Sequence, residues 1–327
     1  MNLDRSVPPP ACIGCGATAL SAAGSISGAD LSWGYRRLLG VDVSGLFRGI
    51  DAVTEYVCTR CELIFFWPLV TGDQVFYAAL ARHPWYYMED KREFEIARRF
   101  VSPGDKVLEV GGGRGAFAKH VGVADYVGLE FSPSAVAAAR DRGIQMLCMP
   151  LEQHAISAQA GYDIACAFQV LEHTPDPRAF VERLAACVKP GGRVIVSVPG
   201  EDSFAGSAIN DFLNLPPHHV TRWRDAALRN LAVNSGMTIE ALEHESVASY
   251  HQAWFLSVRL MRSMGPALTG RPGSRVRLRF PYFHLWRAGA LSIRLTWALL
   301  SRASRAISLL RKSRGHTVVA VMRKPGL

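Results

Sequence analysis

VLEVGGGRGAFAKHV, residues 107 to 121, is the most informative stretch of this chain. A short apolar run ends in Glu109 and a cluster of glycines, and residues that favour a helix follow. Glycine adopts backbone angles that other residues avoid, and it lets a ligand approach the main chain. A helix that begins directly after such a turn presents free N–H groups to anionic parts of the ligand. The stretch therefore predicts a strand, a tight turn and a helix that hold a nucleotide-like ligand.

Strand and helix signals alternate around this turn, from residue 106 to residue 245. The predicted strands are KVLEV at 106–110, YVGLE at 126–130, YDIACAF at 162–168, RVIVSV at 193–198 and MTIEALEHE from Met237. The predicted helices are residues 75–100, SPSAVAAARDRG, a stretch ending in ERLAACV, and TRWRDAALRNLAVNSG. HTVVAVMRK near the end of the chain reads as a strand antiparallel to the one from Met237. This alternation predicts an α/β fold with a doubly wound, mostly parallel sheet.

The composition fits a chain with a substantial core, because 49% of its 327 residues are hydrophobic and 20% are charged. The net charge of +9 is unevenly spread: residues 246–327 hold 15 Lys and Arg and no Asp or Glu. The N-terminal MNLDRSVPPP lacks the pattern of a signal peptide, and no window reaches the roughly 18 apolar residues of a membrane span. Seven cysteines, partly in CxxC pairs, favour a reducing cytoplasm.

Five motifs in order resemble those of the class I S-adenosylmethionine-dependent methyltransferases. Glu109-x-Gly111-x-Gly113-x-Gly115 looks like the first motif, and Glu130 stands where that family's acidic residue holds both ribose hydroxyls. The other three are PLEQ at 150–153, YDIACAFQVLEHTPDP at 162–177 and VKPGGRVIVSVP at 188–199. PLEQ is similar to the family's segment that flanks the adenine. The resemblance covers residues 75–248 and 316–325, and it implies a Rossmann-like sheet of seven strands and methyl transfer from S-adenosylmethionine.

The resemblance implies a set of cofactor-binding residues along these motifs. They are Glu109, Gly111, Gly112, Gly113, Gly115, Glu130, Phe131, Leu151, Glu152, Phe168 and Gln169. Gly111, Gly113 and Ala116 also fit a dinucleotide-binding pattern, so an NAD-dependent oxidoreductase stays an alternative. An RNA methyltransferase is another alternative. So is a non-catalytic binding or assembly protein, although intact Glu109 and Glu130 argue against it.

Histidines follow two of the predicted strands, at the end of the sheet where α/β folds bind ligands. His173 comes after the fourth strand beside Glu172, and His218 and His219 lie in NLPPHHVTRW after the fifth. A neutral imidazole can take a proton near physiological pH. We expect His218 or His219 to be the catalytic base and His173 to be a further candidate. The alternatives are that the PPHH pair caps or packs on the next helix. For Glu172 and His173 the alternative is that they begin the helix after the fourth strand and shape the methionine end of the pocket. In some members of the family that the chain resembles, an equivalent pair binds a metal.

Two CxxC pairs, Cys12–Cys15 and Cys58–Cys61, offer four thiolates, which is a tetrahedral zinc set. Their separation exceeds the common 15 to 20 residues. A methyltransferase subgroup that the chain resembles carries an N-terminal zinc-ribbon-like module with an aromatic tail, here LIFFWP. We therefore predict a structural Zn²⁺. The remaining three cysteines lie in apolar contexts, which predicts core positions for Cys148, Cys166 and Cys187.

If residues 286–312 form a helix, their basic side chains gather on one face and their apolar side chains cover the opposite face. This pattern is typical of a peripheral membrane element, and we expect contact with an anionic membrane surface. A lid or a dimer surface is the alternative. Nucleic acid is disfavoured because its binders commonly place aromatic residues among basic ones. The expected acceptor is a small molecule, a sugar or a lipid-linked glycan, and the expected location is cytoplasmic with peripheral association to the inner face of the membrane.

These signals divide the chain into four predicted parts. They are a zinc-ribbon-like module at 1–70, a methyltransferase domain at 75–248, a basic amphipathic helical insertion at 249–315, and the last strand of the methyltransferase sheet at 316–327.

Overall fold

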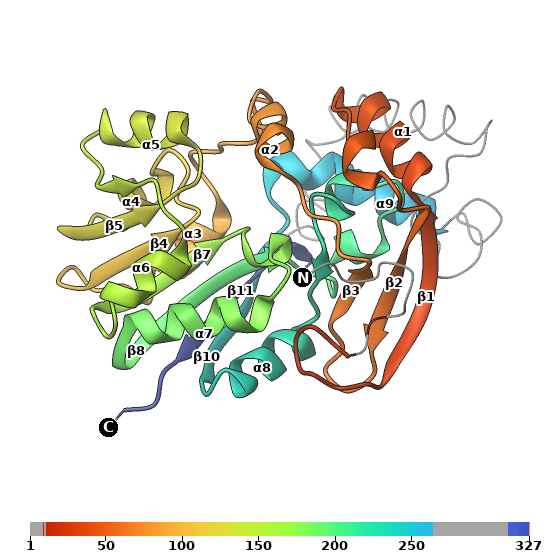
Figure 1. Cartoon of the computed structure of the whole chain (residues 1–327). Helices are drawn as coiled ribbons and strands as arrows, with labels where there is room; N and C mark the ends of the chain where they lie inside the picture. The colour runs from red at the N-terminus through yellow and green to blue at the C-terminus, as the bar shows by residue number, and fades with distance from the viewer. Residues whose placement is uncertain (1–8, 10, 264–312, 327) are drawn as a thin grey trace.

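The structure is a computed structural model that describes residue 9, residues 11–263 and residues 313–326, without the side chains of 260–263. The larger sheet has seven strands in the order β10-β11-β8-β7-β4-β5-β6 (Figure 1). Their bounds are β4 Lys106–Val110, β5 Asp125–Leu129, β6 Met146–Leu147, β7 Tyr162–Phe168, β8 Val188–Pro199, β10 Thr238–Ser246 and β11 Arg314–Arg323. Strands β4 to β8 pair in parallel, and β11 pairs antiparallel with both β8 and β10. The predicted fold class and the antiparallel last strand are confirmed.

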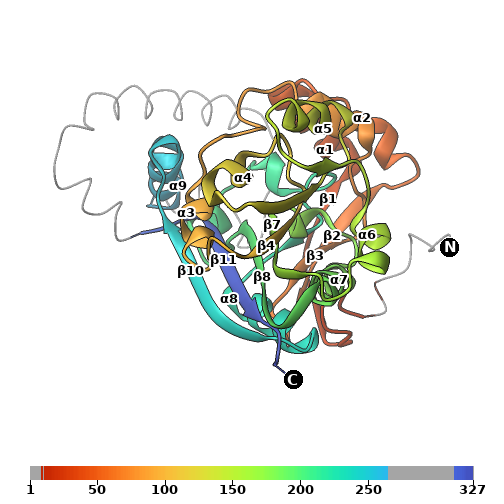
Figure 2. The same cartoon turned by 90° about the vertical axis from the view of Figure 1, so that its left-hand side faces the viewer.

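Helices cover both faces of this sheet because side chains alternate along each strand. On β4, Val107 packs with Phe94 and Phe117 from one layer, whereas Leu108 packs with Leu184 from the other. The first layer contains α3 (Arg92–Arg98) and α4 (Ala116–Val121), and α5 (Pro133–Arg140) packs beside β6. The second layer contains α6 (Leu151–Ser157), α7 (Pro177–Cys187) and α8 (Asp225–Asn234). Figure 2 shows α3 and α4 on one side of the strands and α6 and α7 on the other.

The N-terminal part forms a second sheet with the order β1-β2-β3-β9, in which neighbouring strands are antiparallel. Its elements are β1 Leu20–Ser27, α1 Gly28–Leu39, η1 Ser44–Phe47, β2 Ala52–Cys58, β3 Ile64–Trp67 and β9 Thr221–Arg222. Strand β9 comes from the segment that follows PPHH. The prediction that TRWRDAAL is wholly helical is wrong, because Thr221 and Arg222 pair with Phe65 and Ile64 and the helix begins at Asp225.

Two apolar clusters join the N-terminal part to the methyltransferase domain. Cys12, Cys58 and Cys61 share one cluster with Leu184 and Leu228. The second cluster combines residues of α1 with residues 76–80 and 212–215, and the Tyr35 hydroxyl lies 2.6 Å and 2.8 Å from the carbonyl oxygens of Phe212 and Leu215. The two parts pack through shared cores, and the four-part division of the chain stays a prediction.

The predicted single helix over residues 75–100 is wrong. The structure has α2 at Gln74–Leu80, then turns, and then α3 from Arg92. The turns contain Pro84, which cannot donate a backbone hydrogen bond and interrupts a helix. The remaining elements are η2 Leu171–His173, η3 Phe204–Ser207, η4 Phe212–Asn214, η5 Ser249–His251 and α9 Gln252–Ser263.

The predicted basic helix at 286–312 lies outside the described residues. Among the helices of the described residues, none is long and apolar enough to cross a membrane.

Candidate functional site

The glycine turn follows the carboxyl end of β4 and leads into α4. The N–H of Gly111 donates to the Leu129 carbonyl at 2.8 Å, and the N–H of Gly115 donates to the Gly112 carbonyl at 2.9 Å. Gly111 has φ +75°, and a Cβ added there would lie 2.5 Å from Cγ2 of Val170. A side chain at position 111 would displace Val170, so only glycine fits there. Val170 belongs to the segment between β7 and His173, so the glycine turn lies directly beside that segment.

Glu130 and Phe131 form the other wall of the turn, just after β5. The Glu130 carboxylate accepts the N–H of Gly113 at 2.9 Å and the N–H of Ser132 at 2.9 Å. Each oxygen keeps a further lone pair, which suits the two hydroxyls of a ribose. Phe131 is 70% exposed, so its ring offers an uncovered apolar face to a flat heterocycle. The residues present therefore fit the adenosine part of S-adenosylmethionine.

Other sequence-predicted cofactor residues lie deeper. Glu109 faces the α3–α4 layer, is 3% exposed and accepts a hydrogen bond from the Tyr126 hydroxyl, and burial raises its pKa to about 7. Leu151 packs in the core, and Phe168 packs against both Phe94 and Phe117. These three residues are buried beneath the glycine turn and the ends of the strands, so they pack under the site and do not line its surface.

Glu152 and Gln169 point in different directions. Glu152 faces outward, 3.5 Å from Arg183. Gln169 has a positive φ of 57°, and its Nε2 donates to Glu93 Oε1 at 3.3 Å and to Thr317 Oγ1 at 3.4 Å. Gln169 therefore belongs to a polar group at the carboxyl end of β7, on the side away from the turn.

The four predicted zinc ligands come together. Each cysteine offers a sulfur within 4.8 Å of the others, and the pairs Cys12–Cys61 and Cys15–Cys58 lie 3.7 Å and 3.6 Å apart. Sulfurs bound to one tetrahedral Zn²⁺ at about 2.3 Å would be about 3.8 Å apart. The N–H of Gly14 points at Cys12 Sγ at 3.4 Å, and the Cys61 contact lowers the pKa of Cys12 to about 5. The cluster fits a structural zinc ion.

The other cysteines differ among themselves. Cys166 and Cys187 are buried as predicted. The prediction of a core position for Cys148 is wrong, because this residue is exposed directly after the two-residue edge strand β6, with Sγ 3.7 Å from the Phe131 carbonyl oxygen.

The three predicted catalytic histidines form one cluster. The ring centroids of His173, His218 and His219 lie 4.5 to 4.8 Å apart. Their Nδ1 atoms contact oxygens at 2.5 Å (His218 carbonyl), 2.7 Å (Leu213 carbonyl) and 2.9 Å (Asn214 Oδ1), respectively. Because a carbonyl oxygen only accepts, each Nδ1 carries the proton and each Nε2 keeps a lone pair. Burial lowers the pKa of His173 to about 4 and holds the pKa of the other two well below the usual range.

Glu172 completes this cluster. It is 1% exposed, and neither of its oxygens has a hydrogen-bond partner among the described residues. Its Oε1 lies 3.8 Å from Nε2 of His219, and burial raises its pKa to about 8. The N–H of Val220 donates to the Glu172 carbonyl at 2.9 Å, which ties the PPHH loop to the end of β7. His218 packs on Phe76 and Tyr77 of α2, and His173 packs on Tyr77. The N-cap of α8 is Arg224, so the PPHH pair does not cap this helix.

Sequence analysis missed Asn214 and Tyr77. Asn214 orients His219 from five residues upstream, and Tyr77 Oη lies 3.3 Å from His173 Nδ1. Asn214 opens the quoted segment NLPPHHVTRW, so its place five residues before His219 was the available signal. No pattern in the sequence connects Tyr77 with His173.

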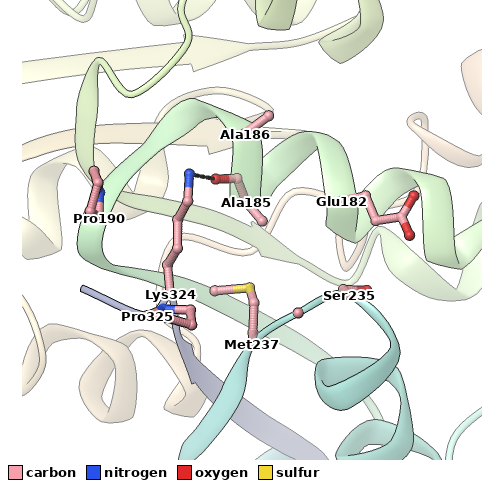
Figure 3. Close-up of a pocket in the computed structure, with 9 residues that line it drawn as sticks. Glu182, Ala185, Ala186, Pro190, Ser235, Met237, Lys324 and Pro325 are labelled. Carbon is pink, nitrogen blue, oxygen red and sulfur yellow. Dashed lines mark hydrogen bonds between the residues drawn. The ribbon is translucent and has the colours of Figure 1, made fainter. Parts of the chain in front are cut away.

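A depression lies at the opposite end of the sheet (Figure 3). It is lined by Ala185, Pro190, Met237 and Pro325, and Lys324 Nζ donates to the carbonyls of Ala185 and Val188 at 2.8 and 2.9 Å. Pro190 belongs to the amino-terminal part of β8. Open α/β sheets bind ligands beyond the carboxyl ends of their strands, so we place the functional site at the glycine turn.

The strand order, the glycine turn and Glu130 define a class I, S-adenosylmethionine-dependent methyltransferase domain. The profile of a family described as methyltransferase domains matches residues 80–243, half of the chain. The chain belongs to this family.

Curated relatives match a shorter part of the chain. The ubiquinone biosynthesis O-methyltransferase of Cronobacter sakazakii is 35% identical over 102 residues, which are 29% of this chain and 42% of the relative. Its counterpart in Salmonella enteritidis is 39% identical over the same length, with the same coverage. The chain thus spans less than half the length of these relatives.

Among solved structures, an S-adenosylmethionine-dependent methyltransferase from Mesorhizobium loti is 13% identical with a TM-score of 0.45, covering 72% of this chain and 99% of that one. A second, from Archaeoglobus fulgidus, is 14% identical with a TM-score of 0.43, covering 77% of this chain and 100% of that one.

Proposed function

We propose that this protein transfers the methyl group of S-adenosylmethionine to a hydroxyl of a small-molecule acceptor, and that His219 takes the hydroxyl proton. One observation carries the proposal: the segment after β7 contacts the glycine turn through Val170 and the histidine cluster through Glu172 and His173. A methyl donor bound at the glycine turn and a base in the histidine cluster would therefore both lie beside the short segment after β7. The names of the curated relatives, which denote O-methylation, also favour an oxygen acceptor.

When bound, S-adenosylmethionine supplies a methyl group on a positively charged sulfur. The protein has to align the acceptor oxygen with that methyl carbon, and alignment alone can lower a barrier by roughly 7–11 kcal/mol in the best intramolecular analogues. As the O–C bond forms and the S–C bond breaks, Nε2 of His219 takes the hydroxyl proton. Asn214 holds the opposite ring nitrogen, so the lone pair of Nε2 keeps its direction. Glu172, when ionised, stabilises the resulting imidazolium.

We expect the rate of methyl transfer to rise with pH and to level off above about 8. The pKa of Glu172 is raised to about 8 by burial, so the carboxyl is neutral below this pH and charged above it. Because His219 is neutral over this range, the rise would report the ionisation of Glu172. A profile of kcat against pH from 6 to 10 measures the inflection.

The matched control for this profile is Glu172→Gln, which keeps the shape of the side chain and cannot ionise. Its rate should be lower and flat across the same range. An unchanged inflection near pH 8 in Glu172→Gln would show that another group titrates, and would contradict the role of this pair.

Replacing Glu130 with glutamine should weaken S-adenosylmethionine binding by about 10- to 100-fold, since hydrogen bonds to a charged group contribute about 1.5–3 kcal/mol. Glutamine keeps one oxygen for the backbone N–H of Gly113 and loses the charge that faces the ribose. Calorimetric titration measures the dissociation constant.

Glu182→Gln serves as the matched control, since it removes a carboxylate from the wall of the distant depression in Figure 3. Its affinity should equal that of the unchanged protein. Weakened binding in Glu182→Gln with unchanged binding in Glu130→Gln would move the cofactor site away from the glycine turn.

A direct test of the function uses labelled S-adenosylmethionine and a cell extract that is split into membrane and soluble fractions. Label transferred to a small hydroxylated compound supports the proposal. Absence of cofactor binding in the titration would favour a non-catalytic binding protein, and binding of NAD in its place would favour an oxidoreductase.

Two finer parts of the proposal concern the acceptor and its location. We propose a sugar or lipid-linked glycan as the acceptor class and an anionic membrane surface as a partner of residues 286–312. The support is the segregated basic and apolar pattern of that segment in the sequence. Co-sedimentation with anionic liposomes, compared between the full chain and a deletion of residues 264–312, tests the membrane contact; equal sedimentation would contradict it.

A further inference from the structure

A second group of ligating side chains lies outside the histidine cluster. Glu245 stands near the end of β10, His251 ends η5, and His316 lies in β11. Each offers one ligand atom, and the three atoms lie within 4.8 Å of one another. The rings of His251 and His316 are 5.1 Å apart, and Nδ1 of His251 is 4.0 Å from Oε1 of Glu245. Three separate parts of the fold thus bring a carboxylate and two imidazoles together.

Two atoms of this group are buried without a hydrogen bond to any described residue. Glu245 is 3% exposed; its Oε1 accepts the N–H of Thr317 at 3.1 Å, whereas its Oε2 has no such partner. The same holds for Nδ1 of His251. Buried polar atoms normally find a partner, because leaving one unsatisfied costs roughly 1–3 kcal/mol. A partner that is neither backbone nor side chain is therefore expected at this place.

The surroundings favour a cation over a further hydrogen-bond donor. The pKa of Glu245 is raised to about 7, first by burial and then by the negative charge of Glu93, which is itself 3% exposed. Arg222 also faces the group, but its guanidinium already pairs with Glu201 at 2.6 Å. Lys91, His219 and Tyr250 are the other titratable groups that face these residues. A bound cation would compensate the negative charges of the buried Glu245 and Glu93.

The ring nitrogens are available for this role. Nδ1 of His251 is buried without a hydrogen bond to a described residue, so this nitrogen can bind an ion. Nδ1 of His316 lies 3.3 Å from Thr317 Oγ1, which orients the ring and leaves Nε2 for an ion. Trp254 packs on both rings, with centroids 5.4 and 5.5 Å away, and limits access of water.

We propose that Glu245, His251 and His316 bind a divalent transition-metal ion of the zinc class, separate from the four-cysteine site. Two imidazoles and one carboxylate are a ligand set of catalytic zinc sites, which keep a fourth position open. Imidazole nitrogens suit zinc or cobalt and disfavour magnesium and calcium, which prefer oxygen. Thr317, next to His316, accepts from Gln169 at the carboxyl end of β7, so this ion would stand on the acceptor side of the site.

The test measures metal content and does not depend on methyl transfer. The full chain is stripped with a chelator, reloaded with Zn²⁺ or Co²⁺, and dialysed to equilibrium before metal analysis. We expect two ions for each chain, and one ion fewer in His251→Ala and in Glu245→Gln. In the Co²⁺ form, these variants should keep the intense thiolate-to-cobalt absorption of the cysteine site, whereas Cys58→Ser should lose it and keep the second ion.

His154→Asn, a histidine outside all three clusters, is the matched control and should retain both ions. Circular dichroism checks that each variant is folded, and Glu245→Gln replaces His251→Ala if the latter is not. The proposal is overturned if the folded variants bind as many ions as the unchanged chain. It is also overturned if the second ion is lost in His219→Asn instead, since that would place it in the histidine cluster.

Discussion

Replacing His219 with asparagine should lower kcat by about 10²- to 10⁴-fold, the range that a positioned general base contributes. Asparagine places an amide N–H where Nδ1 stands, so the hydrogen bond to Asn214 Oδ1 can persist while the basic Nε2 is lost. The glycine turn and Glu130 are untouched by this change, so the dissociation constant of S-adenosylmethionine should stay the same. Steady-state rates at saturating donor, together with calorimetric titration, measure both quantities.

His154→Asn is the distant control for this experiment. His154 lies in α6, and its Nε2 contacts the Tyr162 hydroxyl at 2.9 Å, away from the cluster. Its kcat should remain within about twofold. His218→Asn, inside the cluster, distinguishes chemistry from packing: if it lowers kcat as much as His219→Asn does, the histidines act as a packed unit and His219 is not the individual base.

Replacing Cys58 with serine should remove the zinc ion of the N-terminal module and lower the free energy of unfolding by about 4 kcal/mol or more. Structural zinc contributes roughly 10–16 kcal/mol of apparent binding free energy in small zinc domains. Cys12, Cys58 and Cys61 also belong to the largest apolar cluster, so the loss of the ion would loosen the contact with α7 and α8. Zinc analysis and thermal melting measure the result, and we expect a drop in Tm of about 10 °C.

Cys166→Ser is the matched control, because Cys166 is also buried and its Sγ lies 3.4 Å from the Leu108 carbonyl, which a serine hydroxyl can still reach. This variant should keep its zinc and lose about 1–2 kcal/mol. Equal zinc content and equal melting in Cys58→Ser and the unchanged chain would contradict a structural metal at the four cysteines.

The sequence predicts the strands of the larger sheet well. KVLEV and YDIACAF become β4 and β7 with the predicted bounds, because short apolar runs between turn residues have one stable place in a buried parallel sheet. The helix boundaries are less accurate. TRWRDAAL begins as a strand only because β3 lies beside it, and that neighbour comes from residues 64–67, which no local pattern connects to residue 221.

Some parts of the candidate site can likewise be predicted from the sequence, and others cannot. The glycine turn, Glu130 and the two CxxC pairs are visible as motifs, since each depends on residues close together in the chain. The partnership of His219 with Glu172 is not visible as a motif, and neither is the group of Glu245, His251 and His316. Their members come from different elements, and only the folded sheet and the PPHH loop bring them within contact.

Periodicity and turn chemistry act between neighbours in the chain, so the fold class, the glycine turn and the two CxxC pairs follow from the order of residues alone. Burial and proximity act between residues that are far apart in the chain. They raise the pKa of Glu172 and lower the pKa of the histidines, and they pair the buried Glu109 carboxylate with the Tyr126 hydroxyl. The acceptor-side chemistry of this methyltransferase domain therefore depends on the tertiary structure, because desolvation and charge separation exist only after the chain has packed.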